Sequence, residues 1–194
     1  MEFLAAVNLT GRLVSLELLA GAHTNGLREA VQDGDIHALW YTSAPAPDDV
    51  AADIAGKLAR AERGEMLPFA ILRLSDSRLV GVTTFCNPIA AVPAVEIGYT
   101  WLAASAQRTG INTEAKLLML THAFEAWGCR RVCFRATWYN QPSRRAIERL
   151  GAGFEGRIRN DRVLRTGEVT DTAQYSITDH DWPATRRHLQ HLLG

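Results

Sequence analysis

The chain has 194 residues, of which 47% are apolar and 22% are charged, and its formal net charge is zero. This composition is typical of one globular domain with its own core, and the balanced charge argues against nucleic acid as a partner. No apolar run reaches the roughly 18 residues of a membrane span, and the N-terminus lacks the basic region of a signal peptide. We therefore expect a cytoplasmic protein without a membrane partner.

Cysteine and histidine do not form the pattern of a metal site or a disulfide framework. The three cysteines are Cys86, Cys129 and Cys133, and an odd number without framework spacing predicts reduced thiols. Such cysteines are more often small buried hydrophobes than nucleophiles or ligands. The six histidines include no HExxH pair and no cluster with cysteine, so we expect no bound metal.

The first third of the chain predicts a strand and two helical segments. Residues 13–19 (LVSLELL) have the composition of a strand, and a polar, helix-prone stretch follows to about Trp40. Pro45 and Pro47 then indicate a loop. From residue 48 the apolar positions recur at helical spacing, and the predicted helix ends at Gly64.

The remaining elements alternate between strands and helices. They are predicted as a hairpin of strands at 68–74 and 78–85, a strand at 92–102, a helix at 113–127, a strand at 131–139, a helix opened by Pro142 and closed by Gly151, strands at 154–159 and 168–177, and a helix from about Pro183. The helix at 113–127 is apolar nearly all round, which predicts that it is buried. In the strand at 92–102, strict alternation places Val95, Ile97, Tyr99 and Trp101 on one face and Glu96, Gly98 and Thr100 on the other.

This order of elements predicts a single mixed α/β domain. Consecutive strands favour antiparallel neighbours, whereas the strand–helix–strand step over 92–139 requires a parallel crossover. A mostly antiparallel sheet with one parallel pair and helices on both faces satisfies both. We expect one domain over residues 1–194, with a core over about 13–180 and a C-terminal helix over about 183–192.

The segment QRTGINTEAK, at residues 107–116, is the most informative in the chain. A glycine-containing turn runs directly into the buried helix, which leaves several N–H groups unpaired at the positive end of the helix dipole. Such a turn is suited to bind a phosphate. A second helix headed by Asn140 follows the next strand, so the pattern indicates a nucleotide-tailed cofactor held between two splayed strands.

Four segments in this order make the chain resemble the GNAT superfamily of acetyl-CoA-dependent N-acetyltransferases, and within it the Rim-type branch that acts on ribosomal-protein alanine. The resemblance covers roughly residues 13–193. It is carried by EIGYTWL at 96–102, QRTGINTEAKLLML at 107–120, NQPSRRAIERLGA at 140–152, and DTAQYSI with DWP at 171–183. It implies a GNAT-like fold with a splayed parallel pair, acetyl-CoA as cofactor with CoA as product, and a primary amine as acceptor. The acceptor is a peptide N-terminus or a small molecule, and a homodimer is compatible with the resemblance.

The resemblance also assigns the residues that bind the cofactor. The family's pyrophosphate loop, [QR]-x-x-G-x-[GA], is matched by Gln107 and Gly110, whereas Asn112 replaces the last small residue. Asn tolerates the left-handed backbone and caps helices, so the turn can still form. The side chain of Glu114 is expected to face away from the phosphates, toward Arg108 or Arg130. The residues implied for cofactor binding are Tyr99, Thr100, Trp101, Leu102, Gln107, Arg108, Thr109, Gly110, Ile111, Asn112, Thr113, Asn140, Ser143 and Arg144.

Two residues are candidates for proton transfer. Glu96 lies inside a strand, where glutamate is disfavoured, and it matches the family position of the general base; the alternative is a solvated or salt-bridged side chain. Many GNAT enzymes have a tyrosine acid where this chain has Ile147, which leaves Ser143 or water to hydrogen-bond or protonate the departing sulfur. The alternative for Ser143 is a first-turn serine without a ligand. Asn140 is either a plain N-cap or a ligand of the pantetheine arm, or both.

Four aromatic residues are candidates for the acceptor pocket: Trp40, Tyr41, Phe85 and Trp138. Large aromatics are more often part of the core. A competing hypothesis is a CoA-binding or regulatory module without turnover, which the absent tyrosine and the departure at Asn112 would explain. Rossmann and P-loop folds are disfavoured because neither GxGxxG nor GxxxxGK[ST] follows the first strand.

Overall fold

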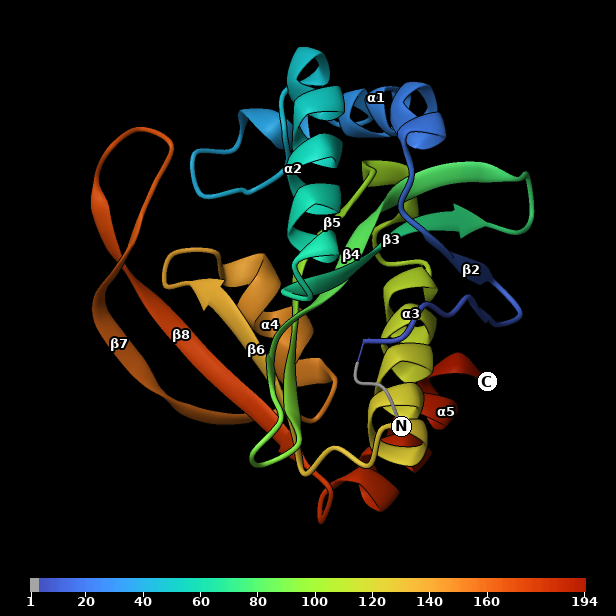
Figure 1. Ribbon diagram of the computed structural model, residues 1–194, viewed down its shortest axis with the longest axis vertical. Coiled ribbons are helices and arrows are strands. Elements are labelled where there is room, and N and C mark those ends of the chain that lie inside the picture. The colour runs from blue at the N-terminus through green and yellow to red at the C-terminus, as the bar shows by residue number, and fades with distance from the viewer. Residues whose placement is uncertain (1–3) are drawn as a thin grey trace.

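The computed structural model describes residues 4–194, so the first three residues of the predicted domain lie outside the described residues. Within this range, the strands form one eight-stranded sheet in the order β1-β2-β3-β4-β5-β6-β8-β7 (Figure 1). All neighbours are antiparallel except β5 and β6, which run parallel. The predicted mixed sheet with one parallel pair is confirmed. No helix of this part of the chain is both long and apolar enough to cross a bilayer.

The elements agree with the predicted ranges to within a few residues at most ends. The strands are β1 (Leu9–Thr10), β2 (Val14–Leu18), β3 (Met66–Arg73), β4 (Arg78–Ile89), β5 (Ala94–Leu102), β6 (Arg131–Thr137), β7 (Gly153–Val163) and β8 (Val169–Thr178). The helices are α1 (Thr24–Gln32), α2 (Val50–Glu62), α3 (Ile111–Thr121), α4 (Gln141–Arg149) and α5 (Trp182–Leu193). The sequence did not indicate the short β1. The helix predicted at 113–127 is α-helical only to Thr121 and continues as a π-helical turn over His122–Ala126.

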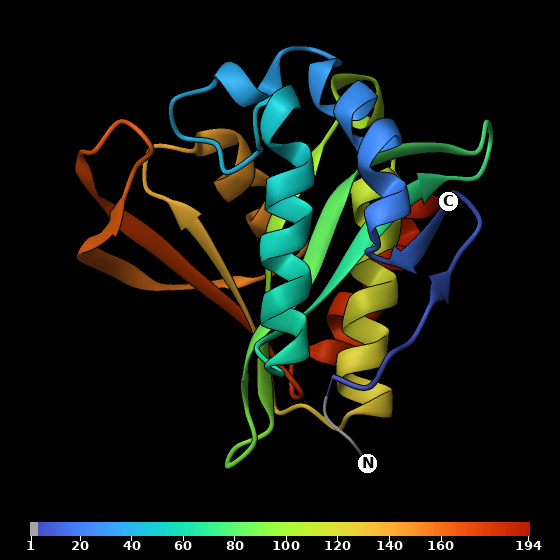
Figure 2. The same cartoon turned by 45° about the horizontal axis from the view of Figure 1, so that its top comes forward.

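Helices cover both faces of the sheet. Helices α1 and α2 lie over one face, and α3 lies on the other with α5 packed behind it (Figures 1 and 2). Helix α3 is therefore enclosed, and its residues Ala115, Met119 and Leu120 are fully buried. The apolar periodicity of this segment predicted that burial correctly.

A β-bulge interrupts the alternation of β5. Its register with β4 pairs Gly98 with Thr84 and Trp101 with Val82, so β5 contains one extra residue between these pairs. Tyr99 occupies the bulge with a φ of +51°, which is unusual for a bulky residue. The predicted faces are therefore correct as far as Gly98, which lies beside the Glu96 side chain, and wrong from Tyr99 onward. Tyr99 turns toward α2, where its hydroxyl accepts a hydrogen bond from Arg60, whereas Thr100 joins the face covered by α3.

Candidate active site

The parallel strands β5 and β6 separate after three residue pairs. Pairing joins Ala94 with Arg131, Val95 with Val132 and Glu96 with Cys133, and then stops. From Ile97 onward, β5 has no strand partner on its β6 side among residues 4–194. Helix α4 begins directly after β6, at the mouth of this opening (Figure 1). The splayed pair expected from the resemblance is present.

The loop before α3 presents a continuous series of unpaired backbone donors. From Arg108 to Thr113, the N–H groups have no hydrogen-bond partner within the described part of the chain. Side chains shape the loop: Gln107 Nε2 donates to the carbonyl of Leu102 at 3.0 Å, and Thr109 Oγ1 donates to that of Ala106 at 2.6 Å. A set of unpaired donors at a helix N-terminus fits the diphosphate of a CoA-type cofactor.

Gly110 is required for this loop because its φ is +88° and a Cβ atom would lie 3.3 Å from Leu13 Cδ1. We predict that Gly110→Val raises the Kd for CoA at least about tenfold, because strain of this kind costs roughly 1–3 kcal/mol. Isothermal calorimetry with CoA measures the effect. Gly56→Ala is the matched control, since Gly56 lies within α2 with no atom near its Cβ position. An unchanged Kd for Gly110→Val would place the diphosphate elsewhere.

Glu96 lies at the last paired position before the strands separate. Its Oε2 accepts a hydrogen bond from Asn87 Nδ2 at 2.9 Å. The register places Cys86 of β4 and Cys133 of β6 directly beside Glu96. Asn87, in left-handed backbone with a φ of +51°, was missed from the sequence. It orients the carboxylate through one hydrogen bond.

The thiols beside Glu96 are not suited to be nucleophiles. Burial raises the pKa of Cys86, and the nearby carboxylate of Glu96 raises it further. Burial also raises the pKa of Cys133. A thiol with a raised pKa stays protonated at neutral pH, and only the thiolate reacts. All three cysteines are free, and Cys86 and Cys129 are buried. In residues 4–194, no group of three or more potential ligands gathers as a metal site.

The first turns of α3 contain two charged residues that are buried, which the sequence analysis did not predict. Glu114 is 4% exposed, and its carboxylate accepts hydrogen bonds from the N–H groups of Arg12, Leu13 and Val14 at 2.6–2.9 Å. The expectation that it faces Arg108 or Arg130 is wrong. Gly11 leaves room for this carboxylate, since a Cβ there would lie 2.5 Å from Glu114 Cδ.

Lys116 is the second of these residues. It is 4% exposed, and its Nζ donates to Thr83 Oγ1 at 2.7 Å and to Thr100 Oγ1 at 2.8 Å. No carboxylate lies within ion-pair distance in the described part of the chain. Burial without a counter-charge disfavours the ammonium and lowers the pKa of Lys116 to about 7.

This lowered pKa predicts how stability depends on pH. In the unfolded chain Lys116 titrates near 10.5, so between pH 7 and 10.5 the unfolded state binds more protons than the folded state. The free energy of unfolding therefore rises with pH across this window, by roughly 1 kcal/mol per pH unit. Lys116→Met lacks this contribution. Denaturant titrations at pH 7 and pH 9 should show that the free energy of unfolding of wild type increases by about 2–3 kcal/mol relative to that of the variant. If the difference in unfolding free energy between the two proteins were the same at both pH values, the amine would not be neutral in the folded state.

The N-terminus of α4 has the cap that the sequence indicated. Asn140 Oδ1 accepts a hydrogen bond from the N–H of Ser143 at 3.1 Å, so the N-cap interpretation is confirmed. The hydroxyl of Ser143 makes no hydrogen bond within residues 4–194. Arg144 stacks on Trp138 and donates to the hydroxyl of Tyr175 at 3.0 Å. These contacts fix the guanidinium of Arg144 against Trp138 and Tyr175, and its contact with the cofactor stays a prediction.

The four aromatic candidates separate into three environments. Phe85 is fully buried and packs against Phe69 and Trp127, so its assignment to the acceptor pocket is wrong. Trp138 is sandwiched between the guanidinium groups of Arg144 and Arg157, at 4.1 and 4.2 Å. Trp40 and Tyr41 are in edge-to-face contact, and Trp40 lines a groove.

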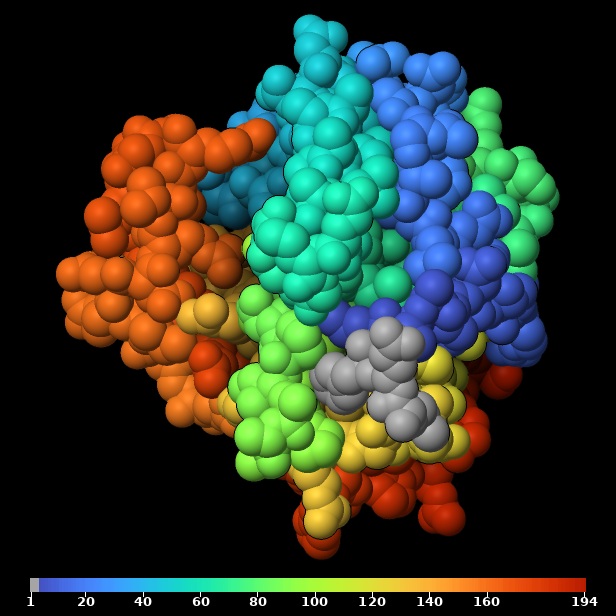
Figure 3. Space-filling view, viewed as in Figure 1, coloured from blue at the N-terminus to red at the C-terminus, as the bar shows by residue number. Residues whose placement is uncertain are grey.

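This groove is an open volume of about 350 Å³ between the α1–α2 loop and the β7–β8 strands. Figure 3 shows the surface hollowed between α2 and β7–β8. Arg165 joins its rims by donating to the carbonyls of His37 and Ala44. The groove is lined by Trp40, Tyr139, Leu164, Thr166, Glu168, Val169 and Thr170.

Comparisons with known proteins agree with this geometry. Residues 14–153 match the family described as Acetyltransferase (GNAT) domain. YdaF of Bacillus subtilis (strain 168), whose name assigns it provisionally to the ribosomal N-acetyltransferases, is 34% identical over 109 residues. That match spans 56% of this chain and 58% of YdaF.

Solved structures extend the likeness to nearly the whole chain. A GCN5-related N-acetyltransferase from Brucella melitensis has a TM-score of 0.84 at 29% identity, covering 97% of this chain and 86% of that chain. Mycobacterium smegmatis RimJ, solved in complex with CoA-disulfide, has a TM-score of 0.77 at 25% identity, covering 96% and 93%. The names YdaF and RimJ support the Rim-type resemblance. Since the family match spans well over half of the sequence, the chain belongs to the GNAT family of acetyltransferases.

Proposed function

We propose that the chain transfers an acetyl group from acetyl-CoA to a primary amine, with Glu96 as the general base. The observation that carries this proposal is the series of unpaired N–H groups from Arg108 to Thr113, beside the opening between β5 and β6. When bound there by its diphosphate, acetyl-CoA supplies an activated acetyl thioester. The chain's own residues then have to orient the acceptor amine and move its proton.

The position of Glu96 supports its proposed role as the acceptor of that proton. It lies on the face of β5 that α2 covers, next to the point where the strands part, and Asn87 holds one of its oxygens. An α-amino group with a pKa of about 7.8 is roughly one-tenth neutral at pH 7, whereas a lysine amine is neutral in well under one molecule per thousand. A carboxylate, acting directly or through one water, therefore suffices for an N-terminal amine.

Backbone and hydroxyl donors complete the proposed site. The bulge at Tyr99 turns the β5 backbone where β6 no longer pairs with it, and the amides within residues 99–102 that face away from β4 are proposed to polarise the carbonyl oxygen. The hydroxyl of Ser143, in the first turn of α4, makes no hydrogen bond within the described residues, and Ser143 is the proposed proton donor on the opposite side. A thiolate with a pKa near 8.5 leaves readily, so a strong acid is not required.

We propose a protein N-terminus as the acceptor class. The relatives named for ribosomal proteins support this choice, and so does the proton balance, which favours α-amines. The groove lined by Trp40 and Tyr139 lies on the same side of the sheet as α2 and could take an apolar side chain of the acceptor. A non-catalytic CoA-binding module is the second candidate, because Ile147 is buried where a tyrosine acid would stand.

A thiol-release assay separates the two functions. Purified protein is incubated with acetyl-CoA and peptides that begin with Ala or Ser, and in parallel with small primary amines. Release of the CoA thiol with a peptide supports the proposal. Release with small amines alone would show that the acceptor is a small molecule and not a protein N-terminus. CoA binding measured by calorimetry, without release for any amine, would favour the non-catalytic module.

A further inference from the structure

The amine of Lys116 connects the two backbone segments on which the proposed site depends. Its helix, α3, begins at the loop with the unpaired N–H groups, and its amine binds Thr100 in the bulge of β5. We propose that Lys116 is a positioning residue that ties this bulge to α3 and thereby holds the β5 amides in fixed relation to the loop. The inference rests on the proposed acetyl transfer, since that reaction uses both segments.

A buried lysine without a counter-charge is an unfavourable choice for packing alone. Lysine is almost never fully buried unless paired, and an apolar side chain of similar length fills such a space without a desolvation penalty. The sequence contains two lysines, Lys57 and Lys116. Lys57 is paired with Asp53 in α2, whereas within residues 4–194 the amine of Lys116 has only hydroxyl groups as polar partners. A lysine at this position therefore indicates a use for its directional donors.

The hydroxyl partners form a closed cluster with the amine. Thr83 Oγ1 and Thr100 Oγ1 lie 2.8 Å apart, and each accepts a hydrogen bond from Lys116 Nζ. Thr83 comes from β4 and Thr100 from β5, so the amine joins α3 to both strands across the bulge. Because Thr100 is half-buried and adjoins the bulge residue, fixing its hydroxyl also fixes the local backbone.

The bulge is the part of β5 that most needs such support. A bulky residue with positive φ costs of the order of a few kcal/mol and persists only where its surroundings hold it. Tyr99 is held from the α2 side by Arg60, whose Nη1 donates to its hydroxyl at 2.8 Å. Lys116 holds the neighbouring residue from the α3 side. The guanidinium of Arg60 and the amine of Lys116 thus hold the bulge from opposite faces of the sheet.

The loop before α3 has a separate anchor, which makes the role of Lys116 testable. Glu114 binds the N–H groups at the start of β2 and so fixes the first turn of α3 without contacting β5. Loss of the Lys116 amine should therefore leave the loop able to bind CoA. It should disturb the β5 amides, whose contribution is to the chemical step.

The experiment compares Lys116→Met and Thr100→Val with wild type. Both variants remove the hydrogen bond while nearly preserving volume, so the second remains informative if the first folds poorly. We expect kcat to fall at least about tenfold in each, because small misplacements of catalytic groups have effects of this size or larger. We expect the Kd for CoA to stay within threefold. Leu120→Ala, which removes a fully buried side chain from the same helix, should lower the melting temperature with kcat within threefold at temperatures where it is folded.

Two results would overturn the inference: wild-type kcat in both variants, or an equal loss of kcat in Leu120→Ala. Hydrogen exchange of the ligand-free protein gives a readout that does not depend on activity. We expect faster exchange at residues 99–102 in Lys116→Met, and unchanged exchange rates there would also overturn the proposed positioning role of Lys116. If the wild-type protein itself released no thiol with any acceptor, the proposed function would be wrong. The exchange measurement would still test whether Lys116 positions the β5 bulge.

Discussion

Replacing Glu96 with glutamine is expected to lower kcat by roughly 10²–10⁴, the usual contribution of a positioned general base. Glutamine preserves the shape of the side chain and can still accept the hydrogen bond from Asn87 Nδ2. The variant therefore loses the proton acceptor with little change in packing. Steady-state thiol release with a reactive peptide measures kcat, and calorimetry should give a Kd for CoA close to that of wild type.

The pH profile identifies the cause of this loss. The neutral fraction of the acceptor amine rises about tenfold per pH unit below its pKa, so the deficit of Glu96→Gln should shrink between pH 7 and pH 9. Asn87→Ala is a graded companion because it leaves the carboxylate and removes its orienting hydrogen bond, although alanine also tolerates the φ of +51° less well than asparagine does. We expect about a tenfold loss for Asn87→Ala. Wild-type turnover by Glu96→Gln would rule out this residue as the base.

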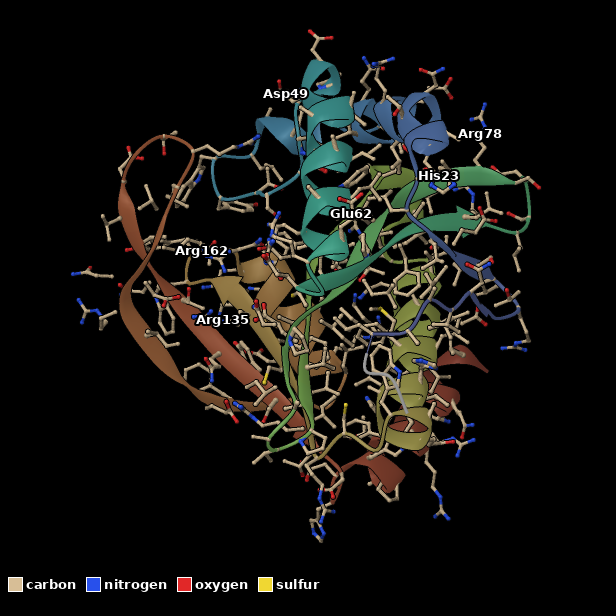
Figure 4. All side chains as sticks on the ribbon, in the orientation of Figure 1. His23, Asp49, Glu62, Arg78, Arg135 and Arg162 are labelled. Atoms are coloured by element: carbon tan, nitrogen blue, oxygen red, sulfur yellow. The ribbon has the colours of Figure 1, made fainter. Side chains whose placement is uncertain are left out.

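Glu114→Ala is expected to destabilise the fold by roughly 3–5 kcal/mol. The substitution leaves three backbone N–H groups without their acceptor at the start of β2, and each such loss costs about 1–3 kcal/mol where the group is buried. Denaturant unfolding measures the change. Glu62→Ala, at an exposed position of α2 (Figure 4), should change stability by no more than about 0.5 kcal/mol.

The same substitution should also weaken CoA binding. Glu114 connects the first turn of α3 to a segment 102 to 100 residues earlier in the chain, so its loss frees the loop that carries the unpaired amides. We expect the Kd for CoA to rise in Glu114→Ala even where the protein is fully folded. A stability loss below 1 kcal/mol would show that water replaces the carboxylate at low cost.

The sequence alone predicted the features that follow from local rules. The glycine turn at Gly110 and the cap of Asn140 on Ser143 depend on residues within one helical turn, and both are present. The mixed sheet followed from the order of the elements, because strand–helix–strand units are parallel and consecutive strands are usually antiparallel.

Features set by long-range contacts were not predictable in the same way. Alternation in β5 gave the wrong faces from Tyr99 onward because the bulge at Tyr99 adds one residue, and contacts from α2 and α3 support the bulge. Phe85 was assigned to the pocket although its strand is buried on both faces. A usable signal was missed for Glu114 and Lys116: charged residues inside a helix that is apolar all round require partners within the protein.

The two buried lysines have a chemical consequence for a protein that handles an acyl thioester. Lys57 and Lys116 are 7% and 4% exposed. They are the only two lysines in the sequence, and all its other basic Lys/Arg residues are arginines. Guanidinium groups stay protonated and do not act as nucleophiles near neutral pH, whereas free lysine amines are slowly modified by reactive esters without any enzyme. Spontaneous acetylation of Lys116 would therefore show that the packing of β4, β5 and α3 had transiently opened. Mass spectrometry of the acetylated fraction over time would measure how often this opening occurs.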